Sequence, residues 1–463
     1  MNHQDTIVAL ATASGVGAIA IIRLSGDQAI VIADRFFTSI KNNKSLSDQK
    51  SHTLHLGRIV DQGRTIDEVL VSVFKNPNSY TGENTIEISC HGSSYIQQEI
   101  IQLFIRNGCR MADPGEFTLR AFLNGKLDLS QAEAVADLIS SDSEASHQVA
   151  MQQMRGGFSN EIKLLREQLL NFASLIELEL DFAEEEVEFA DRAEFKKLIA
   201  RIQLVLKRLI DSFAVGNVIK NGIPVAIVGE PNVGKSTLLN ALLNEDRAIV
   251  SEIAGTTRDA IEDEIIIDGV AFRFIDTAGI RETKDIVESI GIKKTFEKIG
   301  LAQVVIYLFD AEKSKVESQK LKVEIEILKN KHPQKKLIII ANKADKISAD
   351  ELAVLKTEIP ELIAISAKQK QGIETMTNQL TSLINTGALH NNETIVTNSR
   401  HYDALLKALN EINKVDEGTQ LGIPSDLLAI DIRESLYYFG LITGEVTNDE
   451  LLGNIFANFC IGK

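Results

Sequence analysis

The segment GEPNVGKS, residues 229–236, constrains the fold of this chain more than any other stretch. It matches the phosphate-binding pattern G-x-x-x-x-G-K-[S/T] in full. An apolar, strand-like run (VAIVG) leads into it and a helix-like run (TLLNALLN) follows, which is the context that the pattern requires. Backbone N–H groups freed by the glycines can then surround a phosphate at the positive end of the helix dipole. The segment therefore predicts a nucleotide-binding domain built around a strand–loop–helix unit.

The residue types of this loop indicate separate roles. We expect Lys235 to reach the β- and γ-phosphates and to act on them catalytically, and we expect the hydroxyl of Ser236 to ligate Mg²⁺. A chance match in a glycine-rich loop is the competing interpretation, and the three motifs described next disfavour it. The loop residues predicted to contact the nucleotide are Gly229, Asn232, Val233, Gly234, Lys235, Ser236 and Thr237.

Three later motifs predict that the base is guanine. DTAG, residues 276–279, supplies a carboxylate for the outer shell of the metal and a glycine N–H for the γ-phosphate. In NKAD, residues 342–345, Asp345 can accept from the guanine N1–H and exocyclic amine, which adenine cannot match. SAK, residues 366–368, suits a loop that closes on the guanine O6. The predicted contacts are Asp276, Thr277, Ala278, Gly279, Asn342, Lys343, Asp345, Ser366, Ala367 and Lys368.

The segment GTTRD, residues 255–259, is expected to complete the metal site, with Thr257 as a ligand of Mg²⁺ when the γ-phosphate is present. One residue type is missing. Ras-like proteins place a glutamine after DTAG to orient the attacking water, whereas this chain has Ile280, whose side chain cannot do so. Hydrolysis is therefore either slow or supported by another residue and another cation.

The whole chain predicts a multidomain protein that combines α/β and α folds. Residues 1–118 mix β-branched runs with a helix, as is typical of an α+β domain, and residues 119–218 and 384–463 have helical periodicity. Residues 219–383 alternate short apolar runs with helices, which predicts a Ras-like parallel sheet with helices on both faces. The simplest topology inserts this domain into a helical domain built from both flanks. A separate C-terminal domain is the alternative.

Two helices can be delimited more closely. SSYIQQEIIQLFIRNG is expected to end at Gly108, a C′ glycine, and a later helix carries a single apolar stripe. The acidic run ELELDFAEEEVE, residues 177–188, is more typical of a solvated helix face than of a metal site. The stripe comprises Ile162, Leu165, Leu169, Phe172, Ile176 and Leu180.

Composition restricts the function. With 65 acidic against 49 basic residues, the net charge of −16 argues against broad neutralisation of nucleic-acid phosphates, although a local basic site is compatible with it. The cysteines Cys90, Cys109 and Cys460 are typical of a reduced, intracellular chain. Neither a signal peptide nor a membrane span is expected, so we expect a cytoplasmic protein.

Over its whole length the chain resembles the MnmE (TrmE) family of bacterial tRNA-modification GTPases. The resemblance rests on NSYTGENTIEISCHG, DPGEFTLRAFLNGKLDLSQAEAVADLI, GEPNVGKSTLLNALL, AGTTRD, DTAGIRET, TNSRH and the terminal FCIGK. It implies an N-terminal folate-binding α+β domain, a helical domain and an inserted G domain. It also implies a homodimer that forms through the N-terminal domains and whose G domains meet transiently.

The resemblance also implies an answer to the absence of glutamine at Ile280, because these GTPases use K⁺ in the position of an arginine finger. Glu288 matches the family's catalytic glutamate, which orients the water. Ser251 and Thr256 would contact the nucleotide as well as the ion. The implied K⁺ ligands are Asn232, Ser251, Ile253 and Thr256.

A one-carbon site is implied as well, for 5-formyltetrahydrofolate or 5,10-methylenetetrahydrofolate. A folate offers a pterin amide and amine to a carboxylate, and a glutamate tail to Arg or Lys. The flavoprotein MnmG, which holds the FAD, would join in a heterotetramer to add an aminomethyl or carboxymethylaminomethyl group at C5 of wobble uridine 34 of certain tRNAs. GTP hydrolysis would drive a conformational cycle. The implied folate contacts are Arg23, Glu87, Lys126 and Lys463.

Cys460 lies three residues before the last residue and has three interpretations. Prenylation fits poorly, because Gly462 occupies an aliphatic position and Lys463 the terminal one. An inert, buried cysteine is the usual fate of a lone thiol. The resemblance favours a reactive, catalytic thiol near the folate site, since C-(I/L/V)-G-K is the family's terminal signature.

A regulatory or ribosome-assembly GTPase that binds RNA without modifying it is the competing function. Such proteins share Asn232 and its potassium loop, so the G domain does not separate the two functions. The folate-like N-terminal segment and Cys460 do separate them, because a switch would not need either. A third alternative is an N-terminal domain that dimerises and binds no folate.

Overall fold

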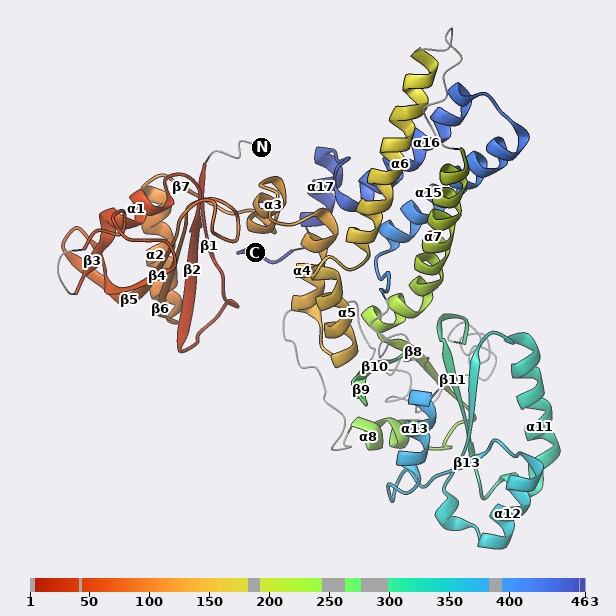
Figure 1. The fold of residues 1–463 in the computed structure, drawn as a ribbon. Coiled ribbons are helices and arrows are strands. Elements are labelled where there is room, and N and C mark those ends of the chain that lie inside the picture. Colours follow the sequence, from red (N-terminus) through yellow and green to blue (C-terminus); the bar gives the residue numbers. More distant parts are fainter. Residues whose placement is uncertain are drawn as a thin grey trace. The chain divides into compact units, whose positions relative to one another are not determined.

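The computed structural model describes residues 5–40, 44–181, 192–243, 263–275, 299–382, 394–457 and 459–462. They form two compact units, which are described separately. Figure 1 colours the chain along the sequence, and most of the second unit runs there from green to light blue. The first unit comprises Met1–Ile139, Met151–Leu206 and Asp403–Lys463, and the second comprises Ser140–Ala150 and Lys207–Tyr402.

The first unit opens with a seven-stranded sheet of order β3-β4-β5-β6-β2-β1-β7. Neighbouring strands are antiparallel except β1 and β7. The alternation expected of TIEISCHG is confirmed, because Ile86, Ile88 and Cys90 are buried and Glu87 lies on the opposite face. The strands are β1 (Thr6–Leu10), β2 (Ile19–Ser25), β3 (Phe37–Ser39), β4 (Thr53–Asp61), β5 (Arg64–Phe74), β6 (Thr85–His91) and β7 (Cys109–Met111).

Two helices bury one face of this sheet. α1 (Ala29–Phe36) and α2 (Ser94–Arg106) pack with the strands in one apolar core, to which Phe104 contributes a fully buried ring. Helix α2 stops where the sequence predicts, because Gly108 follows its C-cap with a φ of 103°. The face that carries Glu87 therefore lies outside this core and is available for a polar site.

Long helices make up the rest of the first unit. The apolar stripe predicted on α6 is confirmed from Ile162 to Ile176, whose stripe side chains are buried, and α6 packs against α16. The side chain of Leu180 lies outside the description. The helices are α3 (Glu116–Leu123), α4 (Leu129–Ser140), α5 (Glu144–Met154), α6 (Gly157–Asp181), α7 (Arg192–Asn221), α15 (Ser399–Leu421), α16 (Ser425–Thr443) and α17 (Asp449–Phe456), of which α4, α5, α7 and α15 also contribute to the second unit.

The acidic run at 177–188 lies mostly outside the described residues. Glu177, at its start, forms an ion pair with Arg433 of α16. Among the residues that the structure describes, no three His, Cys, Asp or Glu side chains gather closely enough to hold a metal ion. None of the helices described is both long enough and apolar enough to cross a membrane.

The second unit contains a six-stranded sheet of order β13-β12-β11-β8-β10-β9. Its neighbouring strands are parallel except β9, which pairs antiparallel with β10 at one edge. The parallel sheet predicted from the alternating apolar runs is thus confirmed. The strands are β8 (Ile223–Val228), β9 (Asp263–Ile267), β10 (Val270–Phe274), β11 (Val304–Asp310), β12 (Lys336–Asn342) and β13 (Ile363–Ala364).

Helices cover both faces of this sheet, as predicted (Figure 1). On β8, Val225 and Ile227 pack on the side of α8 and α13, whereas Ala226 and Val228 pack on the side of α11 and α12. A strand buried on both faces is a continuous apolar run, which is why these strands stand out in the sequence. The helices are α8 (Lys235–Leu243), α11 (Ser314–Lys331), α12 (Ala349–Glu358) and α13 (Ile373–Ser382).

Candidate functional site

The predicted nucleotide-binding segments meet at one edge of the second sheet. β8, β11, β12 and β13 are parallel, and their carboxyl ends lead into loops at that edge, where open α/β sheets bind ligands. The predicted residues present there are Gly229, Asn232, Val233, Gly234, Lys235, Ser236, Thr237, Asn342, Lys343, Asp345, Ser366, Ala367 and Lys368. Those outside the described residues are Ser251, Ile253, Thr256, Thr257, Asp276, Thr277, Ala278, Gly279, Ile280 and Glu288.

The loop after β8 has a backbone that few residues can adopt. At Gly229, whose φ is 150°, a Cβ would lie 2.0 Å from the carbonyl oxygen of Leu308. At Gly234, whose φ is 98°, a Cβ would lie 2.3 Å from Nδ2 of Asn342. Asn232 has a φ of 64°, in the left-handed region that Asn tolerates better than most residues. Close packing and backbone angles therefore both fix the curl of this loop.

Lys235 lies along this loop, because its ammonium donates to the carbonyl oxygens of Gly229 at 2.7 Å and Glu230 at 2.8 Å. The Glu230 carboxylate accepts from Lys320 at 2.8 Å, and that bond holds the pKa of Glu230 below its ordinary value. Ser236 follows in the first turn of α8 and is half-buried. The loop thus presents a cation and a hydroxyl at the amino end of a helix, as phosphate and Mg²⁺ binding require.

Asn342 connects two of the loops. Its amide nitrogen donates to the carbonyl oxygen of Val233 at 2.8 Å, and its amide oxygen accepts from the backbone N–H of Ala367 at 3.0 Å. The side chain is 2% exposed, so neither bond competes with bulk water. The phosphate loop and the SAK loop are therefore held together by one buried amide.

Lys343 makes a second connection, which involves a residue that the motifs do not include. Its ammonium donates to the carbonyl oxygen of Asn232 at 3.0 Å and to the Asp310 carboxylate at 2.6 Å. Burial alone would raise the pKa of Asp310, but the bonds from Lys343 and from the backbone N–H of Glu312 bring it below its ordinary value. The sequence signal for Asp310 is its position at the end of the apolar run VVIYLFD. In the structure this strand pairs with β12, which ends at Asn342, the first residue of NKAD.

Asp345 is the residue expected to read the base. It lies in the short helix η2 (Ala344–Lys346) with its side chain exposed, and the Gln369 amide reaches its carboxylate at 3.5 Å. Ser366, in the neighbouring SAK loop, is buried. An exposed carboxylate at the edge of these two loops fits the two N–H donors of guanine.

Replacing Gly234 by Ala is expected to weaken GTP binding about 100-fold. An added Cβ would displace the Asn342 amide from Val233 and would sit at a φ of 98°, and the strain and the lost bond together amount to about 3 kcal/mol. Titration with a fluorescent GTP analogue measures the change. Gly300→Ala is the matched control, because nothing lies within 4 Å of its added Cβ. A Gly234→Ala affinity within threefold of the original would contradict this account.

A second candidate site lies on the polar face of the first sheet, around Arg23. Its guanidinium pairs with Glu87 at 2.8 Å, across the register that joins β2 to β6. The rings of Tyr80 and Phe117 flank it, with centroids 5.6 and 5.5 Å from the guanidinium carbon. Two of the four predicted folate contacts are thus in direct contact, and aromatic rings lie beside them.

Residues 459–462, called the tail below, reach this second site. The Gly462 carbonyl oxygen accepts from Arg23 at 3.2 Å, and the Cys460 carbonyl oxygen accepts from the backbone N–H of Gly115 at 3.4 Å. Gly462 has a φ of 99°, and a Cβ there would lie 2.1 Å from the carbonyl oxygen of Leu10. Only glycine fits this position, which explains the third residue of CIGK in physical terms.

The three cysteines differ in exposure. Cys90 and Cys109 are buried, and burial raises the pKa of their thiols to about 11 and about 12. Cys460 is exposed, so the interpretation of Cys460 as an inert buried cysteine is wrong. Its thiol is therefore accessible to a ligand in the way a reactive group requires.

Of the other two predicted folate contacts, Lys126 is exposed and its stem lies near Gly82, where an added Cβ would be 3.2 Å from the Lys126 Cε. Gly82 belongs to the loop that carries Tyr80, so Lys126 and Arg23 contact the same loop. Lys463 lies outside the described residues.

Two family models match the chain. One, described as "MnmE helical domain", matches residues 129–460, and the other, described as "GTP-binding protein TrmE N-terminus", matches residues 6–126. The first match alone covers more than half of the chain. The boundary between the two matches lies just after α3.

Curated relatives match along the full length. The chain is 73% identical over 463 residues to the "tRNA modification GTPase MnmE" of Flavobacterium psychrophilum, and the match covers 100% of both chains. It is 73% identical over 467 residues to the protein of that name in Flavobacterium johnsoniae, again over 100% of both. In Bacteroides fragilis a protein of that name is 55% identical over 468 residues and 100% of both chains.

Proposed function

Because the chain belongs to the MnmE family and is a GTP hydrolase that acts in tRNA modification, we propose that K⁺ stimulates its hydrolysis of GTP and that hydrolysis serves a modification of wobble uridine 34. The modification adds an aminomethyl or carboxymethylaminomethyl group at C5. Its methylene carbon comes from a tetrahydrofolate bound by the N-terminal domain. GTP hydrolysis drives a conformational cycle and not the carbon transfer itself.

The observation that carries the proposal is the position of the tail beside Arg23. Hydrogen bonds hold the tail at both Cys460 and Gly462, and the thiol is exposed there. A regulatory or ribosome-assembly GTPase would account equally well for the nucleotide loops. It would not account for a second polar site to which the chain's own terminus is bound.

The nucleotide site fits the two cations that the proposal needs. Ser236 offers a hydroxyl oxygen to Mg²⁺, and Asn232 offers an exposed amide oxygen to K⁺ at the turn of the phosphate loop. When bound, these cations neutralise charge that develops on the β- and γ-phosphate oxygens. Lys235 is long enough to move from the loop carbonyls onto the phosphates. In this proposal Glu288 and Thr257 supply the water-orienting carboxylate and the second Mg²⁺ oxygen.

The site around Arg23 fits a folate by the chemistry of its groups. Glu87 offers a carboxylate to a pterin amide and amine, and Tyr80 and Phe117 offer aromatic surface beside it. Lys126 and, in this proposal, Lys463 supply cations for the glutamate end of the ligand. Cys460 then lies close to the one-carbon group as nucleophile, as acid or base, or as a positioning group.

The proposal includes partners. The chain acts as a homodimer through its N-terminal domains and forms a heterotetramer with the flavoprotein MnmG, which holds FAD. Much of the tRNA contact falls to that partner, which accommodates a net charge of −16 on this chain. With tRNA as the substrate, the site of action is the cytoplasm.

The test is a reconstitution of the purified chain with MnmG, FAD, tRNA, GTP, Mg²⁺, K⁺, 5,10-methylenetetrahydrofolate as the source of the methylene carbon, and ammonium or glycine as the source of the amine nitrogen. We expect nucleoside analysis to detect the modified wobble uridine in the complete mixture. Omitting GTP or the folate should abolish the product. Binding of tRNA with GTP hydrolysis and no modified uridine would instead support the regulatory GTPase.

Replacing Asn232 by Ala is expected to remove the response of hydrolysis to K⁺. The unchanged chain should hydrolyse GTP at least about tenfold faster in KCl than in NaCl of equal ionic strength, because a cation of fitting size replaces an arginine finger. The variant should hydrolyse at the slow rate in both salts. Glu230→Ala changes the neighbouring exposed side chain and should keep the K⁺ response. Equal rates of the unchanged chain in the two salts would exclude potassium from the mechanism.

A further inference from the structure

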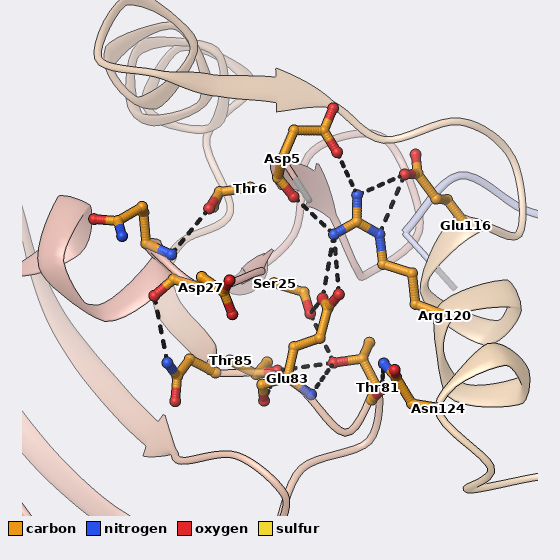
Figure 2. A network of polar contacts seen from close by, with 12 residues as sticks. Asp5, Thr6, Ser25, Asp27, Thr81, Glu83, Thr85, Glu116, Arg120 and Asn124 are labelled. Carbon is orange, nitrogen blue, oxygen red and sulfur yellow. Dashed lines mark hydrogen bonds and ion pairs between the residues drawn. The ribbon is translucent and has the colours of Figure 1, made fainter. Parts of the chain in front are cut away.

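We propose that Arg120 is a positioning residue for the site around Arg23, because its buried guanidinium holds together the loop at 79–84, the start of α3 and, through them, the tail. This inference rests on the proposed one-carbon function of that site. Figure 2 shows Arg120 among Asp5, Glu83 and Glu116, from three separate parts of the chain. Arg120 lies in the segment DPGEFTLRAFLNGKLDLSQAEAVADLI, but the sequence predicts no role for it.

The guanidinium of Arg120 is 1% exposed and donates to three acids. It reaches the Asp5 carboxylate at 2.7 Å, the Glu116 carboxylate at 2.9 Å and the Glu83 carboxylate at 3.2 Å. It also donates to the Asp5 carbonyl oxygen at 2.8 Å. A planar guanidinium can direct its N–H groups to all of these acceptors at once, whereas a lysine ammonium at the same place could not span them.

A second arginine joins the cluster. Arg110 donates to Asp5 at 2.6 Å and to Glu116 at 2.6 Å. The bond from Arg110, together with Arg120, holds the pKa of Asp5 below its ordinary value. Burial would raise the pKa of Glu116, but bonds from Arg110 and Arg120 bring it below the ordinary value. Asp5 and Glu116 therefore stay ionised near neutral pH and remain paired with the two arginines.

The Glu83 side of the cluster fixes the loop at 79–84. The Glu83 carboxylate also accepts from the Ser25 hydroxyl at 2.7 Å, and that hydroxyl shares a hydrogen bond of 2.7 Å with Thr81. On the other side, the Asn124 amide donates to the Thr81 carbonyl oxygen at 2.7 Å. The loop is thus tied to the end of β2 and to the end of α3 (Figure 2).

This loop carries groups that contact two of the predicted folate residues. Tyr80 lies beside the Arg23 guanidinium, and its hydroxyl shares a hydrogen bond of 2.9 Å with Thr118 of α3. Gly82, with a φ of 78°, lies against the stem of Lys126. A shift of the loop would therefore move the ring beside Arg23 and the surface under Lys126 together.

The Glu116 side of the cluster fixes the start of α3, where the tail binds. Phe117 follows Glu116 and provides the second ring beside Arg23. Gly115 precedes it, donates to the Cys460 carbonyl oxygen, and packs so closely on α17 that a Cβ would lie 2.9 Å from the carbonyl oxygen of Phe456. Arg120 therefore bonds directly to both segments that lie against this site: the loop at 79–84, which contacts Arg23 and Lys126, and the start of α3, which contacts Arg23 and the tail.

The test uses Glu83→Gln and Arg120→Lys in the full chain, with 5-formyltetrahydrofolate as the ligand in calorimetric titration. The titrations are run well below the melting temperature of each variant. Each variant is expected to bind the ligand about tenfold more weakly than the unchanged chain. Hydrogen exchange should speed up about tenfold in peptides that cover 79–84 and 459–462 and should not change in the second unit. GTP affinity should also stay unchanged, which shows that the second unit is unaffected, and the melting temperature of each variant shows that the chain is folded.

Asp67→Asn is the matched control. Asp67 is a buried carboxylate of the same sheet, 8% exposed, and accepts from the backbone N–H and the ring of His91 at 2.8 Å. This substitution should change the melting temperature of the chain without changing the folate affinity or the rate of hydrogen exchange at 79–84. Because Glu83→Gln keeps the shape of the side chain, this variant still tests the proposal if Arg120→Lys fails to fold.

The outcomes separate this inference from the proposed function. If the unchanged chain does not bind the folate, the one-carbon site is wrong, and the exchange measurement alone then decides whether Arg120 holds the two segments. If the unchanged chain binds the folate and both variants bind it equally well with unchanged exchange, the positioning role of Arg120 is overturned. Weaker binding together with faster local exchange supports it.

Discussion

Replacing Asp345 by Asn is expected to lower the affinity for GTP about 10³-fold and to transfer the preference to xanthosine triphosphate. The carboxylate can accept from both the N1–H and the exocyclic amine of guanine, and each charged hydrogen bond is worth about 2 kcal/mol. An asparagine offers one acceptor and one donor, so its amide N–H would face a guanine N–H. Xanthine carries a carbonyl in place of the amine and can accept from that amide.

Competition binding with GTP, ATP and xanthosine triphosphate measures this change in the full chain. Asp350→Asn removes an acid from the first turn of α12 in the same unit and should leave all three affinities within twofold. If Asp345→Asn bound GTP and xanthosine triphosphate as the unchanged chain does, Asp345 would not contact the base. The position of the carboxylate at the free edge of its loop would then need another explanation.

Replacing Cys460 by Ser is expected to lower wobble-uridine modification more than about 100-fold and to leave K⁺-stimulated GTP hydrolysis within twofold. Serine has nearly the size of cysteine, so the tail can keep its bonds through Gly462 and Gly115. A hydroxyl is, however, a far weaker nucleophile and acid than a thiol at neutral pH. The reconstituted reaction and a phosphate-release assay, run on one preparation, give both numbers.

Ile461→Ala is the control for Cys460, because it alters an exposed neighbour in the same tail and should keep modification. Alkylation gives a second check. Burial shields Cys90 and Cys109 and raises the pKa of their thiols, whereas Cys460 is exposed. At neutral pH a thiol reagent should therefore alkylate Cys460 and prevent the reaction on the tRNA. If Cys460→Ser modified the tRNA normally, the thiol would have no chemical role and the tail would serve only in binding.

Most of the nucleotide site could be predicted, because its signals are local in the sequence. A phosphate loop needs glycines at fixed spacings, and Gly229 and Gly234 occupy the positive φ angles that this spacing implies. The parallel strands are buried on both faces, so each is a continuous apolar run. A loop that follows such a run lies at the carboxyl edge, which places Asp345 and Ser366 near the phosphate loop without knowledge of their contacts.

The groups that hold these loops in place could not be predicted, since they depend on contacts between distant positions. The sequence predicts Asn342 as a contact of the nucleotide. The neighbouring residues in the sequence do not indicate that its side chain joins Val233 to Ala367. Arg120 lies in the short helix α3, and its acid partners Asp5 and Glu83 come from the residue before β1 and from a loop far away in the sequence. Such pairing is a property of the fold, and a single sequence does not show it.

The bridge made by Asn342 has a consequence for how a nucleotide is recognised. The two halves of a guanosine triphosphate meet loops that are already joined by a buried amide, so ordering those loops against each other is part of folding and adds little to the entropy cost of binding. The base and the phosphates then act as a chelate: once one is seated, the other is presented at high effective concentration to its own loop. A free base or a free phosphate gains none of this, so the buried bridge at Asn342 favours binding of the intact nucleotide.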